Sequence, residues 1–453
     1  MNRSKPRIRL DLTICAIALI GGGGAHAQCQ LAKLIGSDAS NGDSVSSVAI
    51  DGGILAFGAT YEDLPASNAG AVYVFALNGG VWMQVAKLSA ADAAGDDYFG
   101  CGLSMDGGTI VVGALDDGAE TGAAYVFQRD QGGPGNWGQV KKLIGSDSAG
   151  GDKFGYHVSI SGDTAIAGAF GHDLPSLADA GAAYIFDRHQ GGTDNWGEVK
   201  KLFAPDAAAA DNFGWATAID GDCSAVGALN RDEVGSDSGA VYIFCRDQGG
   251  SGNWGFVKKL VPNDASSGDW FGTAVSMQGD TIVVGALFAD GNQATAGAAY
   301  VFQRNSGGPN NWGQVCKLQA SDGVSNQEFG RGVAVDGDVV VIGAARDNLA
   351  SDGAAYVFRI NQAGPNPCVQ QGKIVPSDLG SDDKFGHSVA LSGTTALVRS
   401  YLDDNQAGTD AGSAYVFFVG PGCIPTLSEW GMMAMALLML SAGGVVIARR
   451  RAA

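Results

Sequence analysis

One phrase recurs seven times along the chain. It runs Asp-x-Phe-Gly, a short alternating stretch, Gly-Asp, an apolar run ending in Val-Gly-Ala, then Gly-Ala-Ala-Tyr-Val-Phe, Asn-Trp-Gly and Lys-Leu. Six copies carry the phenylalanine, at Phe99, Phe154, Phe213, Phe271, Phe329 and Phe385, and Val45 holds that place in the first copy. Successive spacings are 54 to 59 residues. A nearly constant period made of strand and turn signals predicts a repeat architecture.

Each copy contains four strand signals. In the third copy, Val158 and Ile160 alternate with polar residues, a Gly-Asp turn follows, and 164–169 is small and apolar. Segments 182–186 and 198–202 supply two more strands. Seven units of four antiparallel strands predict an all-β fold, a seven-bladed β-propeller over residues 28–419. A β-sandwich could carry the same alternation, but it would not need seven similar copies.

The ends of the repeat region predict how the ring closes. Residues 31–34 match the fourth-strand phrase, yet no first three strands precede them. The last copy stops at its third strand, 414–417. We therefore expect the N-terminal strand to complete the last blade, which removes a free sheet edge. The Gly-Ala pairs are expected near the central axis, and the Tyr, Phe and Trp side chains between blades.

Both ends of the chain look like export signals. Residues 1–27 combine basic residues, an apolar stretch and Ala25-His26-Ala27, which predicts a secretory signal peptide. Processing as a lipoprotein at Cys29 is the weaker alternative. After a linker, 420–431, the run 432–448 is apolar and uncharged, and 449–453 contains three arginines. This order predicts one C-terminal transmembrane helix with a basic cytoplasmic tail.

Two resemblances follow from these residues. The C-terminal phrase resembles the IPTL-CTERM sorting signals of Gram-negative bacteria; its residues are Ile424, Pro425, Thr426, Leu427, Trp430 and Gly431. That resemblance implies an exosortase-like sorting enzyme as partner, transient anchoring in the inner membrane, and a final place at the cell surface or outer membrane, or outside the cell. A plain membrane anchor is the alternative.

The Phe-Gly and Gly-Ala pairs of 30–418 resemble FG-GAP repeats, best known from the integrin alpha-subunit head. The last copy departs from them, with Val398-Arg399-Ser400 in place of the Gly-Ala pair.

The FG-GAP resemblance raises the possibility of calcium, which integrin-type blades bind through alternating aspartates. The candidate acids here are Asp116, Asp117, Glu120, Asp232, Asp237, Asp403 and Asp404. None shows that alternation, so we expect no cofactor, with weak calcium affinity as the alternative. A second group of acids stands two places before the phenylalanine slot: Asp43, Asp97, Asp152, Asp211, Asp269 and Asp383. Because they recur, we expect them to cap backbone N–H groups.

No catalytic motif is present in the sequence, and the body has four histidines, His157, His172, His189 and His387. His157 and His387 are expected on first strands, on the surface or in the central channel. Cys223 and Cys245 are expected opposite each other on adjacent strands, and Cys29 and Cys423 flank the closing strands. Both pairs are disulfide candidates in an exported protein. Zinc is not expected, because no Cys-x-x-Cys pair occurs.

The net charge narrows the function classes. It is −19, and because the segments 1–27 and 424–453 are both positive, the remaining body carries −24. Such a body repels nucleic acid. The sequence favours a non-enzymatic, surface-anchored propeller for adhesion to, or recognition of, an extracellular protein or polysaccharide. The alternatives are an enzyme that acts on extracellular glycans and a structural component of a matrix or biofilm.

Overall fold

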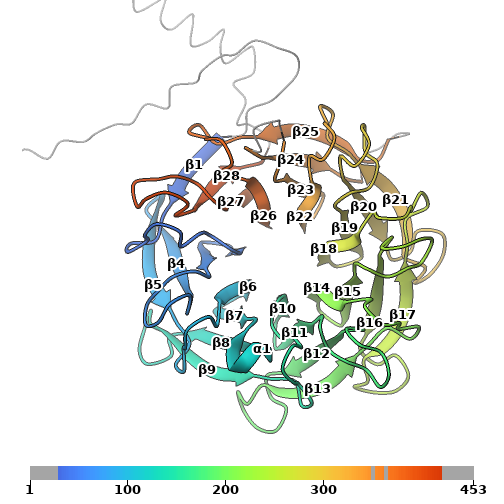
Figure 1. Cartoon of the computed structure of the whole chain (residues 1–453), viewed down its shortest axis with the longest axis horizontal. Helices are drawn as coiled ribbons and strands as arrows, with labels where there is room; N and C mark the ends of the chain where they lie inside the picture. The colour runs from blue at the N-terminus through green and yellow to red at the C-terminus, as the bar shows by residue number, and fades with distance from the viewer. Residues whose placement is uncertain (1–28, 348–351, 362–365, 421–453) are drawn as a thin grey trace, which may run out of the picture.

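The computed structural model describes residues 29–347, 352–361 and 366–420, which form one closed ring of seven four-stranded sheets (Figure 1). Every sheet is antiparallel, and in six of the seven its strands follow chain order from the axis outward. The predicted seven-bladed propeller is therefore confirmed. The predicted signal peptide, sorting motif and transmembrane helix lie outside the described residues.

The first four blades contain strands of four to eight residues. Blade 1 contains β2 (Val48–Asp51), β3 (Ile54–Ala59), β4 (Ala71–Asn78) and β5 (Val81–Leu88). Blade 2 contains β6 (Phe99–Asp106), β7 (Thr109–Ala114), β8 (Ala123–Arg129) and β9 (Trp137–Leu143). Blade 3 contains β10 (Val158–Ser161), β11 (Thr164–Ala169), β12 (Ala182–Asp187) and β13 (Gly197–Leu202). Blade 4 contains β14 (Phe213–Asp220), β15 (Cys223–Ala228), β16 (Ala240–Cys245) and β17 (Gly255–Leu260).

The remaining blades repeat this order. Blade 5 contains β18 (Phe271–Gln278), β19 (Thr281–Ala286), β20 (Ala298–Gln303) and β21 (Gly313–Leu318). Blade 6 contains β22 (Phe329–Asp336), β23 (Val339–Ala344), β24 (Ala354–Arg359) and β25 (Val369–Ile374). Blade 7 contains β26 (Phe385–Ser392), β27 (Thr395–Ser400), β28 (Ser413–Phe418) and, as its outer strand, β1 (Cys29–Leu34). Among the described residues, the one helical element is α1 (Asp117–Glu120), in the loop after β7.

Blade 7 closes as predicted. β1 pairs antiparallel with β28, from Cys29 opposite Phe418 to Leu34 opposite Ala414, with one irregularity after Gln30. Figure 1 shows β1 from the start of the chain beside β28 from its end. The N-terminal strand therefore covers what would otherwise be the free edge of the last blade.

The core lies between neighbouring blades. In one such layer, Ile185 of blade 3 packs with Tyr242 and Trp254 of blade 4, all at most 2 % exposed. The phenylalanine of the repeat lies in such a layer too, since Phe99 packs with Val72 of blade 1 and lies 5.6 Å from Tyr125 of blade 2 between ring centroids. Aromatic side chains thus fill the widening space between sheets, as expected from their place in the repeat.

Glycine is required where blades approach most closely. A Cβ on Gly113 would lie 1.8 Å from the carbonyl oxygen of Gly155 in the next blade. Gly155 itself has φ of 85°, a conformation that side chains disfavour. The glycines of the Gly-Ala and Phe-Gly pairs therefore allow backbone-to-backbone contact between successive blades.

The turns between first and second strands form a ring of hydrogen bonds on one face, which we call the turn face. In each blade the last residue of the first strand accepts a bond from a glycine N–H in the next blade's turn. Asp106, for example, accepts from Gly162 at 2.5 Å, and Ser392 of blade 7 accepts from Gly52 of blade 1 at 3.1 Å. The other donors are Gly107, Gly221, Gly279, Gly337 and Gly393. These bonds link all seven blades in one direction around the axis.

Candidate functional site

The opposite face, which we call the loop face, carries the loops after the second and fourth strands of each blade. One polar cluster recurs in these loops. In blade 2, Lys142 lies 2.7 Å from Asp92 and 2.8 Å from Asp117, and the Tyr125 hydroxyl lies within hydrogen-bond distance of both acids. The Lys142 ammonium also lies 5.3 Å from the centre of the Tyr125 ring. The cluster joins the third and fourth strands to two loops.

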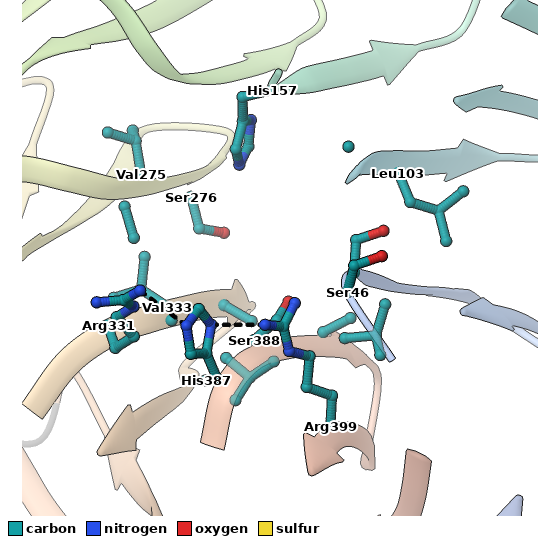
Figure 2. A pocket seen from close by; sticks show the side chains of 18 of the residues that line it. Ser46, Leu103, His157, Val275, Ser276, Arg331, Val333, His387, Ser388 and Arg399 are labelled. Carbon is teal, nitrogen blue, oxygen red and sulfur yellow. Dashed lines mark hydrogen bonds between the residues drawn. The ribbon is translucent and has the colours of Figure 1, made fainter. Parts of the chain in front are cut away.

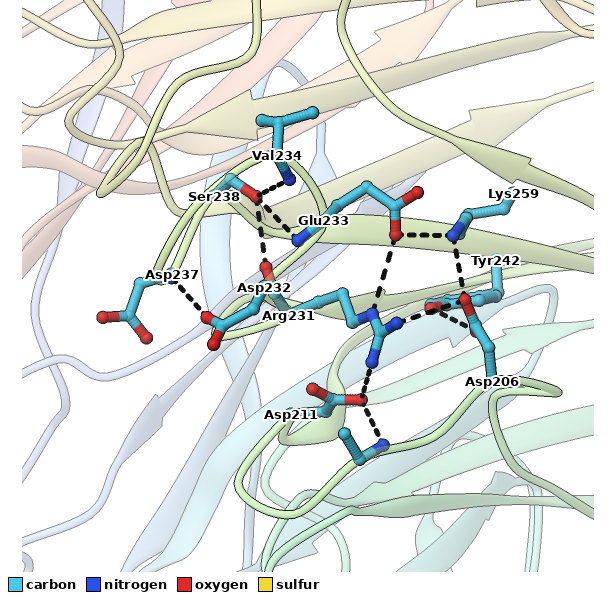
Figure 3. Close-up of polar contacts among 11 residues, drawn as sticks. Asp206, Asp211, Arg231, Asp232, Glu233, Val234, Asp237, Ser238, Tyr242 and Lys259 are labelled. Atoms are coloured by element: carbon cyan, nitrogen blue, oxygen red, sulfur yellow. Dashed lines mark hydrogen bonds and ion pairs between the residues drawn. The ribbon is translucent and has the colours of Figure 1, made fainter.

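The third residue after the Gly-Ala pair differs between blades and changes the cluster. The seven residues there are Glu62, Asp117, His172, Arg231, Ala289, Asp347 and Asp403. Figure 3 shows blade 4, where Arg231 contacts Asp211 at 3.1 Å and Lys259 contacts Glu233 at 2.5 Å. Most of these seven side chains are buried, so the differences between blades change the contacts that hold each loop in place.

Two aspartates in these loops, Asp92 and Asp383, have pKa values shifted in opposite directions. Partial burial alone would raise the pKa of Asp92, but hydrogen bonds from Lys142 and Tyr125 outweigh it and lower that pKa. Asp383 is buried, and burial together with the charges of Asp403 and Asp404 raises its pKa to about 6, although the Gly380 N–H and Lys33 oppose this.

The six aspartates before the phenylalanine slot cap the backbone as predicted. Each accepts from the N–H three residues earlier, for example Ala208 to Asp211 at 2.7 Å and Gly380 to Asp383 at 2.6 Å. The remaining four acceptors are Asp43, Asp97, Asp152 and Asp269. They hold the loop that enters each inner strand.

The calcium candidates pair with lysines or with the backbone, except that the Asp237 carboxylate accepts from the Ser236 hydroxyl. Asp116 and Glu120 both contact Lys153, at 2.8 and 2.9 Å. Asp117 belongs to the Lys142 cluster, and Asp232 accepts the N–H of Asp237 at 2.8 Å. In blade 7, Asp403 contacts Lys33 at 2.9 Å and Asp404 accepts the N–H of Asp410 at 2.9 Å. Within the described ranges, no group of three or more possible metal ligands converges.

A central channel of about 960 Å³ runs along the axis, lined by residues of all seven blades. Its aromatic lining comes mainly from blades 1 to 5, and we call it the aromatic arc: Tyr61, Tyr98, Tyr156, Trp215 and Trp270. Tyr156 and Trp215 lie 4.9 Å apart between ring centres. These rings come from the positions around the Phe-Gly and Gly-Ala pairs, where the repeat meets the axis.

Basic side chains line the other part of the channel, in blades 6 and 7. We call them the basic arc: Arg331, Arg346, Lys384, His387 and Arg399. Figure 2 shows the His387 ring between the two guanidinium groups, with Arg331 2.7 Å from Nε2 and Arg399 2.9 Å from Nδ1. Burial, with the charges of Arg399 and Arg331, lowers the pKa of His387 well below its ordinary value. The imidazole is therefore neutral at physiological pH.

The four histidines separate into three environments. His157 and His387 line the channel, the second alternative of the prediction, and burial lowers the pKa of His157 to about 4. His172 is buried in the blade 3 cluster, 2.7 Å from Asp152. His189 is exposed near Asp163. The histidines do not gather at one point.

Arg399 is the functional candidate that sequence reasoning missed. The loss of the Gly-Ala pair in the last copy was visible, and it marks this position. In the six other blades the slot holds glycine, since the next blade's backbone leaves no room for a Cβ. In blade 7 the slot holds Arg399, whose side chain lines the channel.

The structure contains two disulfides among the described cysteines. One joins Cys223 and Cys245, which stand opposite each other on β15 and β16. The other, Cys316 to Cys368, joins blades 5 and 6 and was not anticipated, although the 52-residue separation of these cysteines is close to one repeat period. The side chain of Cys29 and all of Cys423 lie outside what the structure describes, and Cys101 is free.

The described part of the chain has no helix with the length and hydropathy that a membrane crossing requires.

No match to the chain was found among curated proteins. The model of the FG-GAP repeat matches seven times, at 29–75, 82–127, 137–186, 196–244, 254–302, 312–358 and 368–417. The model of the IPTL-CTERM motif matches residues 424–451. Since the seven repeats cover most of the chain, the protein belongs to the FG-GAP repeat family and ends in an IPTL-CTERM motif.

Proposed function

We propose that this protein recognises an extracellular protein or polysaccharide at the loop face of its propeller, without catalysing a reaction on it. An FG-GAP propeller with a C-terminal sorting motif suggests an exported surface protein. The observation that supports recognition is the channel, where aromatic and basic side chains gather at the axis of a rigid ring. Pockets of mixed aromatic and polar lining are typical ligand sites.

The sorting tail supports a second part of the proposal. An exosortase-like enzyme acts on the motif at 424–431, and the run 432–448 anchors the chain in the inner membrane until then. Replacing Pro425 and Trp430 together by alanine should retain the chain in the inner-membrane fraction, measured by fractionation and immunoblotting. An unchanged distribution would contradict the sorting role.

The binding proposal is tested with the full chain in detergent. It is screened against glycans and extracellular material of the producing cells, with and without calcium. We expect saturable binding with no release of new reducing ends. Absence of binding in both conditions, or hydrolysis of a bound glycan, would contradict recognition without catalysis.

A further inference from the structure

Positive charge concentrates in the channel of an otherwise acidic protein. Among the residues that line the channel, four carry a full positive charge and one, Glu328, carries a negative charge. Glu328 contacts Arg346 at 3.0 Å and Arg331 at 3.6 Å, so it offsets only part of that charge. The whole chain carries −19, so this local excess is not a property of the surface in general.

Arg399 is the least compensated of these groups. It is 5 % exposed, and its Nε has no hydrogen-bond partner in the described structure. Burial lowers its pKa to about 9, and repulsion by Arg331 acts in the same direction. The titratable groups that act on Arg399 most strongly are tyrosines, which are neutral, and Arg331, with no carboxylate among them. A buried guanidinium without an anion is costly, because burial removes its hydration.

The contacts of His387 show the same lack of acceptors. Guanidinium groups only donate hydrogen bonds, and a neutral imidazole has one acceptor nitrogen and one N–H. Arg331 and Arg399 approach opposite ring nitrogens, so only one of them can donate to the ring. The other guanidinium faces the ring N–H, so two hydrogen-bond donors face each other with no acceptor between them. Both His387 and the two arginines therefore have donors that an anion would satisfy.

The aromatic arc faces the same channel as these donors. Aromatic faces pack well on flat, partly apolar rings. A uronic acid carries its carboxylate at the edge of a sugar ring whose C–H face is apolar. An acidic peptide carries carboxylates on flexible side chains and has no such ring face. The pairing of the two arcs therefore favours a saccharide.

We propose that the channel binds an acidic saccharide, with Arg331, His387 and Arg399 holding a uronate carboxylate and the aromatic arc stacking on the sugar rings. This site rests on the proposed recognition function and specifies its ligand class. A carboxylate accepts two parallel N–H bonds from a guanidinium, which gives geometric selection as well as charge. The ligand enters from the loop face, where the aromatic side chains stand.

The test measures binding of the full chain in detergent by isothermal titration calorimetry. The probes are a linear galacturonate trimer, the neutral trimer maltotriose, sodium acetate, and a hexaglutamate peptide. We expect the galacturonate trimer to bind most tightly and maltotriose not to bind. Arg399→Gln and Arg331→Gln should each weaken the trimer by roughly tenfold or more, as expected for a hydrogen bond to a charged group.

Arg188→Gln is the matched control, because Arg188 is about as exposed as Arg331 but pairs with Asp194 and Asp163 away from the channel. It should leave binding unchanged. Arg331→Gln keeps the test valid if Arg399→Gln does not fold, which a thermal melt detects. Three outcomes would each overturn the proposal: wild-type trimer affinity in both channel variants, acetate or hexaglutamate binding as tightly as the trimer, or no binding of the trimer. The recognition function fails separately, if the wild-type chain binds no extracellular material.

Discussion

At the scale of single residues, one position separates the seventh copy of the repeat from the other six. Six copies have glycine at the first position of the Gly-Ala pair, and the seventh has Arg399. The glycine of the Gly-Ala pair is fixed by the neighbouring backbone, and a Cβ on Gly343 would lie 1.7 Å from the carbonyl oxygen of Gly386. Blade 1, the neighbour of blade 7 in the ring, has Val45-Ser46 in place of a Phe-Gly pair. The first and last copies therefore depart from the repeat together, and this junction accommodates an arginine.

Gly343→Ala tests the backbone contact between blades. The added Cβ meets backbone, which cannot rotate away, so the free energy of unfolding should fall by about 1–3 kcal/mol or more. Gly53→Ala is the control, since Gly53 lies in a turn with only an ordinary contact at 3.9 Å. It should change stability by less than about 0.5 kcal/mol. Urea denaturation measures both, and equal effects would contradict the contact.

Asp383 should make stability depend on pH in an unusual direction. Its pKa of about 6 in the folded chain exceeds the value of about 3.9 expected for an unfolded aspartate. The folded state therefore takes up a proton first as pH falls, and this residue's contribution to stability rises between pH 7 and pH 4.

Asp383→Asn mimics the protonated form and keeps an oxygen acceptor for the Gly380 N–H. The variant should melt at a higher temperature than the wild type at pH 8 and lose that advantage by pH 4. Melting curves at both pH values measure this. A difference that is the same at pH 8 and pH 4 would contradict the raised pKa.

At the scale of elements, the outer strands of neighbouring blades are joined by a repeated contact. Lys141 of β9 donates to Asn195 at 3.1 Å, and Lys200 of β13 donates to Asn253 at 2.8 Å. Cys316 occupies the corresponding lysine position of β21, and it bonds to Cys368 just before β25. A covalent bond thus replaces a hydrogen bond between blades 5 and 6.

Cys316→Ser with Cys368→Ser should lower the free energy of unfolding by about 2–4 kcal/mol, because the bond closes a loop of 52 residues. Cys223→Ser with Cys245→Ser should cost less, since its loop of 22 residues is shorter. Thermal melts of the oxidised proteins measure both. Equal melting temperatures for the Cys316–Cys368 variant and the wild type would contradict the stabilising role.

The sequence predicted the elements well and the channel poorly, for one physical reason. Strand pattern, turns and the capping aspartates are local, so each copy repeats the same signal; the recurrence of Asp211, Asp383 and their equivalents was enough to predict their capping role. The basic arc joins residues of two blades, and Arg331 and His387 are 56 residues apart along the chain. No local pattern marks such a pair. Only comparison of equivalent positions across copies could have identified Arg399.

At the scale of the whole molecule, stability depends on the pairing of β1 with β28. Leu34 is 5 % exposed and packs in the layer between blades 7 and 1, with Val416 and Phe57. Leu31, three residues earlier on the same strand, is 54 % exposed. The same strand therefore supplies a buried leucine and a matched exposed one.

Leu34→Ala should lower the free energy of unfolding of the whole ring by about 2–5 kcal/mol. Leu31→Ala should change it by less than about 0.5 kcal/mol. Denaturation followed by tryptophan fluorescence measures both, because tryptophans lie in blades 1 to 5 and in the channel. A loss confined to local fraying of β1, with an unchanged global transition, would contradict the closure role.

The closing strand also sets an order of events. A polypeptide leaves the ribosome or an export channel with its N-terminus first. β1 therefore emerges before any partner exists for it and must wait through six complete blades for β28. Its final partner, Phe418, stands six residues before the matched sorting motif begins at 424. The ring can lock only when the sorting tail is about to arrive, so completion of folding and presentation of the tail coincide in time.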